Sequence, residues 1–392
     1  MSMTGRRAST LKSISTGLFG GLIGLISLLC ACASLETTPP TPEASAVETE
    51  RRLQVQAAID ERLELTRRVQ RLAWPLLSKS TDICADDVKP TLGLRFADAE
   101  ALADAIKGLR EQDVRFAGYD DRVRVIAAPK NAPAGAAGVL AGDEILSVNG
   151  EPLPDRHRLK AVAKAFDAAL ETVDDADAPP VRLGLRRGDE LLDLEVSPEP
   201  ACKTGLALGS TPTINASAGF RTITVHAGLA RAVDDRQLQF VIAHELGHRL
   251  MRHPQKGTRA SLLSGRAALG VAGGVVGGIA DIGLSLIGRK PEIPLGVRGA
   301  ALAVYPFGEG FEREADYWAV YLIARTGGDL TDVEDIYATF ATLSPTSSWA
   351  RIIHPPTPER AVAVRDAVAE VRAKAAAGAP LLPEGYAPPA GD

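Results

Sequence analysis

Along this chain the apolar residues switch between helical spacing and strand spacing. Helical spacing predicts four helices, at 47–77, 156–172, 234–250 and about 310–325. We expect the first to end near Pro75, since proline disfavours helix continuation. Short apolar runs bounded by turn residues predict strands at 144–148 and 222–225, and a hairpin with arms 181–185 and 191–196. The pattern predicts an α+β protein.

The first thirty residues have the pattern of an export signal. Basic residues precede an apolar run, Leu18–Leu29, that is too short and glycine-rich for a transmembrane helix. Residues 29–34 (LCACAS) resemble a bacterial lipobox, with Cys32 as the lipidated cysteine. The Ala after Cys32 resembles lipoproteins sent to the outer membrane, so we expect a lipid-anchored protein facing the periplasm. An ordinary secretory signal cut nearby is the alternative.

Composition excludes several classes of protein. The chain has 392 residues, is 45% apolar, and has a net charge of −5, which argues against nucleic-acid binding and against global disorder. Four cysteines are too few for a disulfide scaffold. The expected parts are a signal peptide (1–31), a Pro/Thr-rich tether (32–46), a helical segment (47–83), a β-rich module (84–204), a larger domain (205–374) and a disordered tail (375–392).

The β-rich module has a recognisable signature. Residues 132–151 (APAGAAGVLAGDEILSVNGE) resemble the core of a bacterial, HtrA-like PDZ domain. In that family a peptide adds as a strand and backbone amides capture its carboxylate, which implies Gly93, Leu94 and Phe96 as candidate peptide-binding residues. The helical pattern of 98–110 departs from the usual family order.

Two cysteines, Cys84 and Cys202, flank this module. A PDZ-like fold brings its ends together, so a disulfide between them is geometrically reasonable. Closing so long a loop would stabilise the protein by about 4–5 kcal/mol in the chain-entropy model, as an upper figure. Two buried free thiols are the alternative.

The strongest chemical signal lies in the helix predicted at 234–250. His244 and His248 in His-Glu-Leu-Gly-His are one turn apart, so both imidazoles can bind one Zn²⁺. Glu245 lies close enough to act as the general base on a water. The alternative is two histidines on a helix face. Apolar neighbours such as Phe240 and Ile242 weigh against it, because unpartnered buried histidines are costly.

A third ligand is expected from the helix near 310–325. Glu312 and Asp316 are one turn apart, so one can bind metal while the other hydrogen-bonds a ligand histidine. Glu314 points away and is expected to face solvent. A solvated helix start is the alternative for this acidic cluster.

These two motifs together resemble the zinc metallopeptidase family of HtpX, BepA and the CAAX prenyl proteases. Residues 215–216 (NA), 223–229 (ITVHAGL) and 354–360 (HPPTPER) extend the resemblance over about 205–372. It implies one zinc per chain, a mainly helical zincin-type metallopeptidase domain with a small sheet, and the PDZ-like domain before it. The implied roles are zinc ligands for His244, His248 and Glu312, general base for Glu245, and a supporting catalytic carboxylate for Asp316.

His354 keeps three interpretations. By resemblance it is a fourth, inhibitory ligand or a transition-state donor, and otherwise it is a loop histidine beside prolines. His157, His226 and His253 are expected to be structural or surface residues. Residues 261–287 are rich in Gly, Ala and Val, and the uncharged stretch 267–280 within them is too short to span a bilayer. We expect the segment to form a glycine-rich helical pair near the active site, with membrane dipping as the alternative.

The implied function is a zinc endopeptidase acting on polypeptides, including misfolded cell-envelope proteins, with the PDZ-like module recruiting them. The alternatives are a chaperone-like assembly factor with a latent zinc site, and a pure PDZ scaffold. The complete set of metal-binding residues argues against the scaffold.

Overall fold

The computed structural model describes residues 40–84, 87–154, 158–171, 179–256, 308–343 and 354–386. The predicted export signal, Cys32, and the glycine-rich segment 261–287 lie outside the described residues. Residues 51–392 form one compact unit, and the described part of the unit before it, residues 40–50, is exposed. None of the described helices has the length and apolar character that crossing a bilayer requires.

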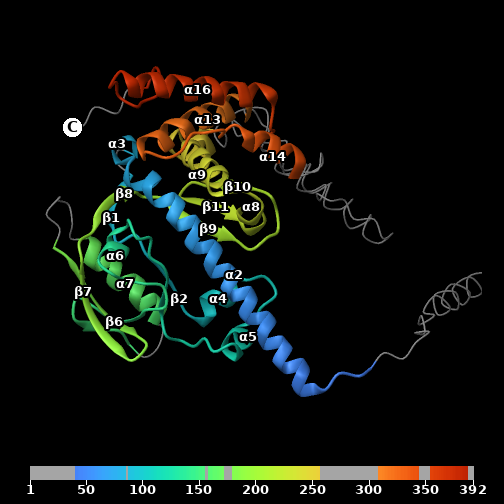
Figure 1. The fold of residues 1–392 in the computed structure, drawn as a ribbon. Helices are drawn as coiled ribbons and strands as arrows, with labels where there is room; N and C mark the ends of the chain where they lie inside the picture. The colour runs from blue at the N-terminus through green and yellow to red at the C-terminus, as the bar shows by residue number, and fades with distance from the viewer. Residues whose placement is uncertain are drawn as a thin grey trace, which may run out of the picture. The chain divides into compact units, whose positions relative to one another are not determined.

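Helix α2, Ala44–Ser78, is the first long element (Figure 1). Beyond residue 51 one face of it is buried, and its buried positions include Val55, Ile59, Val69 and Leu76. The predicted end near Pro75 is wrong. Proline removes a single backbone donor, and the fully buried Leu76 keeps the last turn packed against the core. A short helix, α3, Thr81–Cys84, follows.

A β-rich module follows and has the predicted PDZ-like fold. Its six-stranded sheet has the order β2-β3-β4-β6-β7, with β5 pairing to β4. The strands are β2 Arg95–Ala97, β3 Arg124–Ala127, β4 Glu144–Val148, β5 Glu151–Pro152, β6 Val181–Arg187 and β7 Glu190–Val196. The helices are α4 Ala99–Ala105, α5 Glu111–Phe116, α6 Pro133–Ala136 and α7 Arg158–Glu171.

The sheet forms from local signals. Asn149 and Gly150 have φ of 51° and 81°, so they make the tight reversal that pairs β4 with β5. Alternate residues of β6 are buried, and Leu183 and Leu185 are fully covered by α7 and the neighbouring strands. The module's core is therefore built from apolar side chains.

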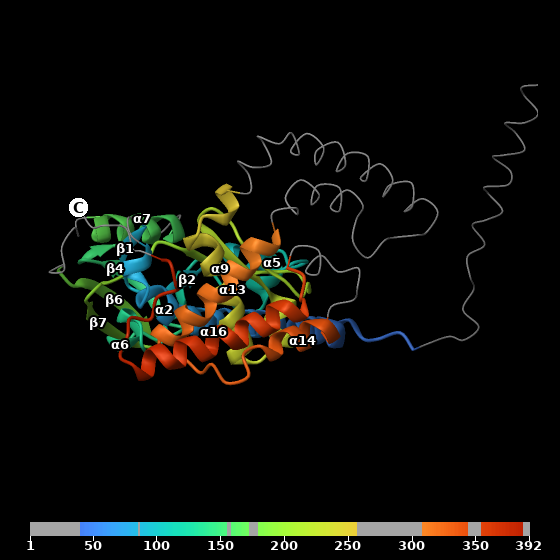
Figure 2. The same ribbon diagram turned by 90° about the horizontal axis from the view of Figure 1, so that it is seen from above.

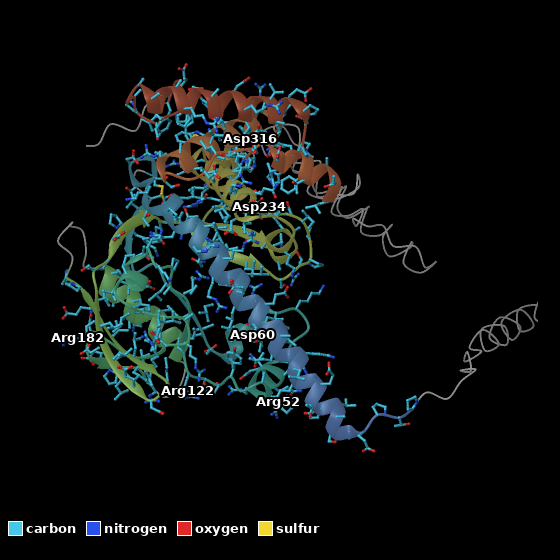
Figure 3. All side chains as sticks on the ribbon, in the orientation of Figure 1. Arg52, Asp60, Arg122, Arg182, Asp234 and Asp316 are labelled. Atoms are coloured by element: carbon cyan, nitrogen blue, oxygen red, sulfur yellow. A yellow bond between two sulfur atoms is a disulfide. The ribbon has the colours of Figure 1, made fainter. Side chains whose placement is uncertain are left out.

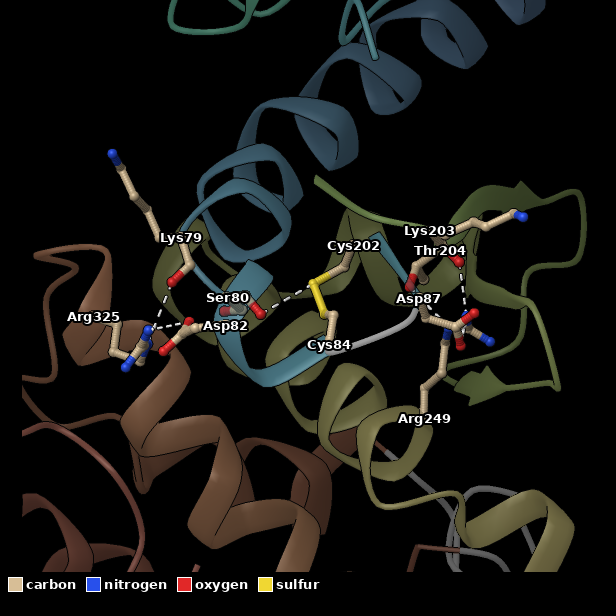
Figure 4. Close-up of a disulfide and its surroundings, with 10 residues drawn as sticks. All are labelled: Lys79, Ser80, Asp82, Cys84, Asp87, Cys202, Lys203, Thr204, Arg249 and Arg325. Carbon is tan, nitrogen blue, oxygen red and sulfur yellow. Dashed lines mark hydrogen bonds and ion pairs between the residues drawn. A yellow bond between two sulfur atoms is a disulfide. The ribbon is translucent and has the colours of Figure 1, made fainter. Parts of the chain in front are cut away.

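A disulfide joins the two ends of the module. Strand β1, Val88–Thr91, pairs with β8, Glu199–Cys202, and beside them Cys84 is bonded to Cys202 with Cα atoms 5.7 Å apart (Figure 4). Close by, the Arg249 side chain donates hydrogen bonds to the Lys203 carbonyl at 2.7 Å and to Thr204 Oγ1 at 2.8 Å. The end of the module is thus tied to the helix that carries His244 and His248.

The remaining elements form a small sheet and a stack of helices. The sheet has the order β10-β11-β9, with β9 Gly205–Gly209, β10 Ala216–Ala218 and β11 Thr222–His226. The helices are α8 Ala227–Ala232, α9 Asp235–Leu250, α13 Gly308–Arg325, α14 Asp335–Leu343 and α16 Pro358–Ala376. In both ribbon views α13 lies between α9 and α16 (Figures 1 and 2).

Helix α9 has the sequence signals that its position requires. Asp234 caps its N-terminus by accepting a hydrogen bond from the Gln237 N–H at 2.9 Å. A Cβ at Gly247 would lie 3.0 Å from the Ala315 carbonyl oxygen, so glycine permits the close approach of α9 to α13. This approach brings the two predicted metal-binding helices into contact.

The disorder expected for the tail 375–392 is wrong for residues 375–386, since α16 extends to Ala376 and the residues after it are ordered against the core. Leu381, Leu382 and Tyr386 pack against the main core, and the Tyr386 ring meets Trp318 edge-on at 4.7 Å. Burying these three apolar side chains stabilises the segment, although its Ala/Pro/Gly-rich composition is typical of disorder.

Candidate metal centre

Three predicted ligands converge where α9 meets α13. His244 and His248 are 5% and 7% exposed, and their Nε2 atoms lie 3.0 Å apart. Glu312 on α13 places its Oε2 3.4 Å from His244 Nε2 and its Oε1 3.2 Å from His248 Nε2. The three side chains therefore point at one place from two helices.

The structure also places His354 in this cluster. Its Nδ1 lies 2.8 Å from Glu312 Oε2, and its Nε2 lies 3.7 Å from Glu245 Oε1. Together with His244, His248 and Glu312 it offers four ligand atoms within 4.8 Å of one another. His354 therefore lies close enough to the three predicted ligands to bind the same metal ion.

The donor set fits a zinc ion. Two imidazole nitrogens and a carboxylate are a common ligand set of catalytic zinc. Glu245 is 2% exposed, and its Oε2 makes no hydrogen bond among the described residues. A buried carboxylate oxygen left without a partner costs free energy unless a substrate, water or cation meets it. Glu245 therefore keeps one buried oxygen that can accept a hydrogen bond.

The charged groups of the cluster shift one another's pKa values. Burial alone would raise the pKa of Glu312, but the charge of His354 and hydrogen bonds from His244 and His248 hold it well below its usual value. Burial alone would lower the pKa of His244, but hydrogen bonds to Asp316 and Glu312 raise it to about 10. Without a metal, a proton on His244 compensates the buried carboxylates.

Asp316 holds His244 from behind. Its Oδ1 lies 2.9 Å from His244 Nδ1, so the other ring nitrogen of this histidine faces the cluster. Burial alone would raise the pKa of Asp316, but the charge of Arg360 lowers it. Asp316 thus stays ionised and orients the imidazole.

Arg360 is a functional residue that sequence reasoning did not assign. It is 4% exposed and donates from Nε to Asp316 Oδ2 at 2.7 Å, while its Nη1 lies 3.1 Å from Glu312 Oε2. It also donates to the Pro355 carbonyl at 3.0 Å, next to His354. Its position in the segment 354–360 was the available signal, but only the packing of α16 shows which carboxylates it contacts.

His253 and Glu314 make a contact beside the cluster that the sequence did not indicate. His253 is 4% exposed, its Nδ1 lies 2.8 Å from His248 Nδ1, and its Nε2 lies 2.7 Å from Glu314 Oε2. The Glu314 side chain is 43% exposed, in line with the expected solvent-facing position, and it also contacts His253. No helical spacing reveals this contact, because His253 lies beyond the end of α9.

A narrow apolar pocket opens beside His244 and Glu245. Its apolar walls include Leu229, Phe240, Ile336 and Phe340. The Tyr337 hydroxyl faces the same region and makes no hydrogen bond of ordinary length among the described residues. Burial, and then the charge of Asp316, raise the pKa of Tyr337 well above its usual value, so the hydroxyl stays protonated.

The predicted peptide-binding residues lie together at one edge of the module. Gly93 has φ of 66° in the loop before β2, which is an edge strand of the sheet. Gly93 and Leu94 line an open cleft, whereas Phe96 packs on Phe166 of α7 with ring centroids 5.4 Å apart. Peptide capture at this loop stays a prediction.

Comparisons with known proteins agree with the site. Residues 193–368 match the model of Peptidase family M48. The metalloprotease LoiP of Escherichia coli (strain K12) is 30% identical over 145 residues, 37% of this chain and 54% of LoiP. The metalloprotease YcaL of the same organism is 28% identical over 150 residues, 38% of this chain and 55% of YcaL. The chain spans about half the length of these curated relatives.

A solved structure also resembles part of the chain. A crystal structure of the HtrA3 PDZ domain bound to a phage-derived ligand is 25% identical and covers 29% of this chain and 88% of that domain. Its TM-score is 0.19, so the PDZ-like description rests on the sheet order and helices described above.

Proposed function

We propose, from the match of residues 193–368 to the model of Peptidase family M48, that this domain is a zinc-dependent endopeptidase of the cell envelope. The observation that carries the proposal is the unpartnered Glu245 Oε2 beside the converging His244, His248 and Glu312. Structural residues buried this deeply would be expected to satisfy every polar atom. The unpartnered Glu245 oxygen suits a side chain that hydrogen-bonds a substrate or an attacking water.

The chain's own residues would divide the chemistry between them. His244, His248 and Glu312 would hold the zinc ion, which would supply a Lewis acid for the scissile carbonyl and lower the pKa of a water. Glu245 accepts the proton of the attacking water and delivers it to the leaving amine. Asp316, held by Arg360, keeps the His244 ring in the orientation that ligation requires.

The pocket beside Glu245 supports a proposal for the substrate class. Its walls of Leu229, Ile336 and Phe340 would accept an apolar side chain next to the scissile bond. Such side chains are buried in folded proteins and exposed in misfolded ones. This supports a role in quality control of envelope proteins, with unfolded polypeptides as substrates.

The location is part of the same proposal. The lipobox-like residues 29–34 support a lipid anchor on Cys32, placing the protein at the outer membrane and facing the periplasm. The Cys84–Cys202 disulfide is consistent with that compartment, because disulfides persist in oxidising surroundings. Replacing Cys32 by Ser should move the protein from the membrane fraction to the soluble fraction.

The PDZ-like module would recruit substrates by their C-termini. Strand β2 lies at the sheet edge beside Gly93 and Leu94, which is the arrangement that strand addition needs. A charge introduced by Leu94→Asp should weaken binding of a C-terminal peptide and leave cleavage of short peptides unchanged. Loss of both would mean that the module is structural.

A second function, a chaperone-like assembly factor with a latent zinc site, is favoured by one observation. His354 lies against Glu312 and faces Glu245, so it can occupy the place of a substrate. Under this alternative a Glu245→Gln variant would support envelope assembly as well as the wild type does.

The experiment that separates these functions compares wild type with Glu245→Gln on an unfolded polypeptide. Removing a general base should slow cleavage by about 10²–10⁴-fold without changing zinc content. Cleavage by the wild type that is no faster than by the variant would remove the peptidase proposal.

A further inference from the structure

The second metal-binding histidine, His248, has an unusual partner on its far side. Its Nδ1 faces another imidazole nitrogen, His253 Nδ1, at 2.8 Å, whereas His244 Nδ1 faces the carboxylate of Asp316. His253 reaches this place because the chain reverses after α9, where Arg252 adopts φ of 56°. A carboxylate therefore contacts Nδ1 of His244, whereas an imidazole contacts Nδ1 of His248.

His253 is held firmly in that position. It is 4% exposed, and its ring stacks on Phe311 with centroids 4.4 Å apart and an interplanar angle of 14°. Its other nitrogen, Nε2, lies 2.7 Å from Glu314 Oε2 on α13. Both ring nitrogens and the ring plane are thus fixed by contacts.

These contacts fix the direction of the hydrogen bonds. An ionised carboxylate only accepts, so Glu314 takes its hydrogen bond from a proton on His253 Nε2. A neutral His253 then has a lone pair at Nδ1, which can accept only from a proton on His248 Nδ1. With its proton there, His248 has a free lone pair at Nε2, the nitrogen that faces Glu312.

An imidazole suits this position better than a carboxylate for a reason of charge. Glu245, Glu312 and Asp316 already place three carboxylates within the buried cluster. A neutral imidazole passes the hydrogen bond outward, so the negative charge sits on Glu314, whose side chain is 43% exposed. The exposed charge costs less to solvate than a fourth buried one.

We propose that His253 and Glu314 are positioning residues that set the tautomer and orientation of His248 for metal binding. In naming the metal the inference rests on the proposed zinc function, but the tautomer of His248 is a property of the protein itself. Removing such an outer partner typically lowers metal affinity by about 10–100-fold.

Zinc affinity, measured by competition with a chromogenic chelator, gives the first test. His253→Ala should bind zinc about 10–100-fold more weakly than wild type. His253→Asn should recover most of the loss, because its amide oxygen can accept from His248 Nδ1. Glu314→Gln keeps an acceptor for His253 and should lose less than Glu314→Ala. Glu309→Gln, an exposed acid of the same helix, is the matched control and should be unchanged.

The second test reads the tautomer directly by ¹⁵N NMR of the metal-free, histidine-labelled protein. We expect His248 to carry its proton on Nδ1 in wild type and His253→Asn, and to show mixed tautomers in His253→Ala. Equal zinc affinity in wild type and His253→Ala would overturn the inference. So would a folded His253→Asn variant as weak as His253→Ala. If the wild type binds no zinc, the proposed function fails, and the NMR measurement still decides the inference.

Discussion

The PDZ-like module and the peptidase domain bury different kinds of side chain. In the module's described residues the buried charged positions are Asp143 and Glu144. Its other charged residues are half-buried or exposed, and Arg122 and Arg182 are among the exposed ones (Figure 3). In the peptidase domain the buried polar and charged residues are Asn215, His244, Glu245, His248, Arg249, His253, Glu312, Asp316 and Arg360.

This difference shows how each region is stabilised. The module is stabilised mainly by apolar burial, which needs no special partner and tolerates substitutions that preserve volume. The metal centre is stabilised by charges that compensate one another, so removing one leaves another buried and unpaired. Removing a single contact should therefore have different consequences in the two regions.

The largest effect is expected at the disulfide that closes the module. Cys84 and Cys202 are separated by 118 residues, and replacing both by Ser should lower the free energy of unfolding by up to about 4.7 kcal/mol. Urea denaturation with and without reductant measures this. A wild type whose stability does not respond to reductant would show that the link contributes nothing.

The next largest effect is expected at Arg360. Arg360→Met leaves Asp316 and Glu312 without their buried cation and should cost about 3–5 kcal/mol in urea denaturation of the metal-free protein. Zinc affinity should fall as well, because both carboxylates lose a fixed position. A loss below 1 kcal/mol would break the contrast between the two regions.

A cavity in the module tests the other side of the comparison. Leu183 is fully buried, so Leu183→Ala should cost about 2–5 kcal/mol in the same assay. Zinc affinity should remain that of the wild type, because this side chain contacts none of the metal-binding residues. A matching fall in zinc affinity would mean that the regions are more tightly coupled than their cores suggest.

The smallest effect is expected from an exposed ion pair. Arg231 and Glu61 form a bidentate contact, but their side chains are 45% and 48% exposed. Arg231→Met should change stability by about 0–1 kcal/mol, and salt should weaken even that. Because the substitution is the same as at Arg360, the difference between the two variants isolates the effect of burial.

Elements set by local signals could be predicted from the sequence. The strand Glu144–Val148 was placed with its observed bounds, because turn residues flank it on both sides. The helix of His244 was placed within one residue, because Asp234 has a strong capping signal. The predicted metal-binding residues come together because they lie on the same faces of two such helices.

Features that depend on tertiary contacts could not be predicted in this way. His253 reaches His248 only because the backbone reverses at Arg252, and Arg360 reaches Asp316 only because α16 packs on α13. The tail residues Leu381 and Tyr386 are ordered by the core they cover, although their composition resembles a disordered segment. The spacing of residues predicts which side chains share a face of one helix or strand. It does not predict which other element packs against that face.

The proposed zinc site is tested most directly by titrating metal-free protein with zinc and measuring how much zinc each chain binds. Wild type and Glu245→Gln should each bind one zinc per chain, because Glu245 is not among the three proposed ligands. A variant with His244, His248 and Glu312 all replaced by Ala, shown to be folded by circular dichroism, should bind none. Equal zinc content in that variant and the wild type would contradict the account.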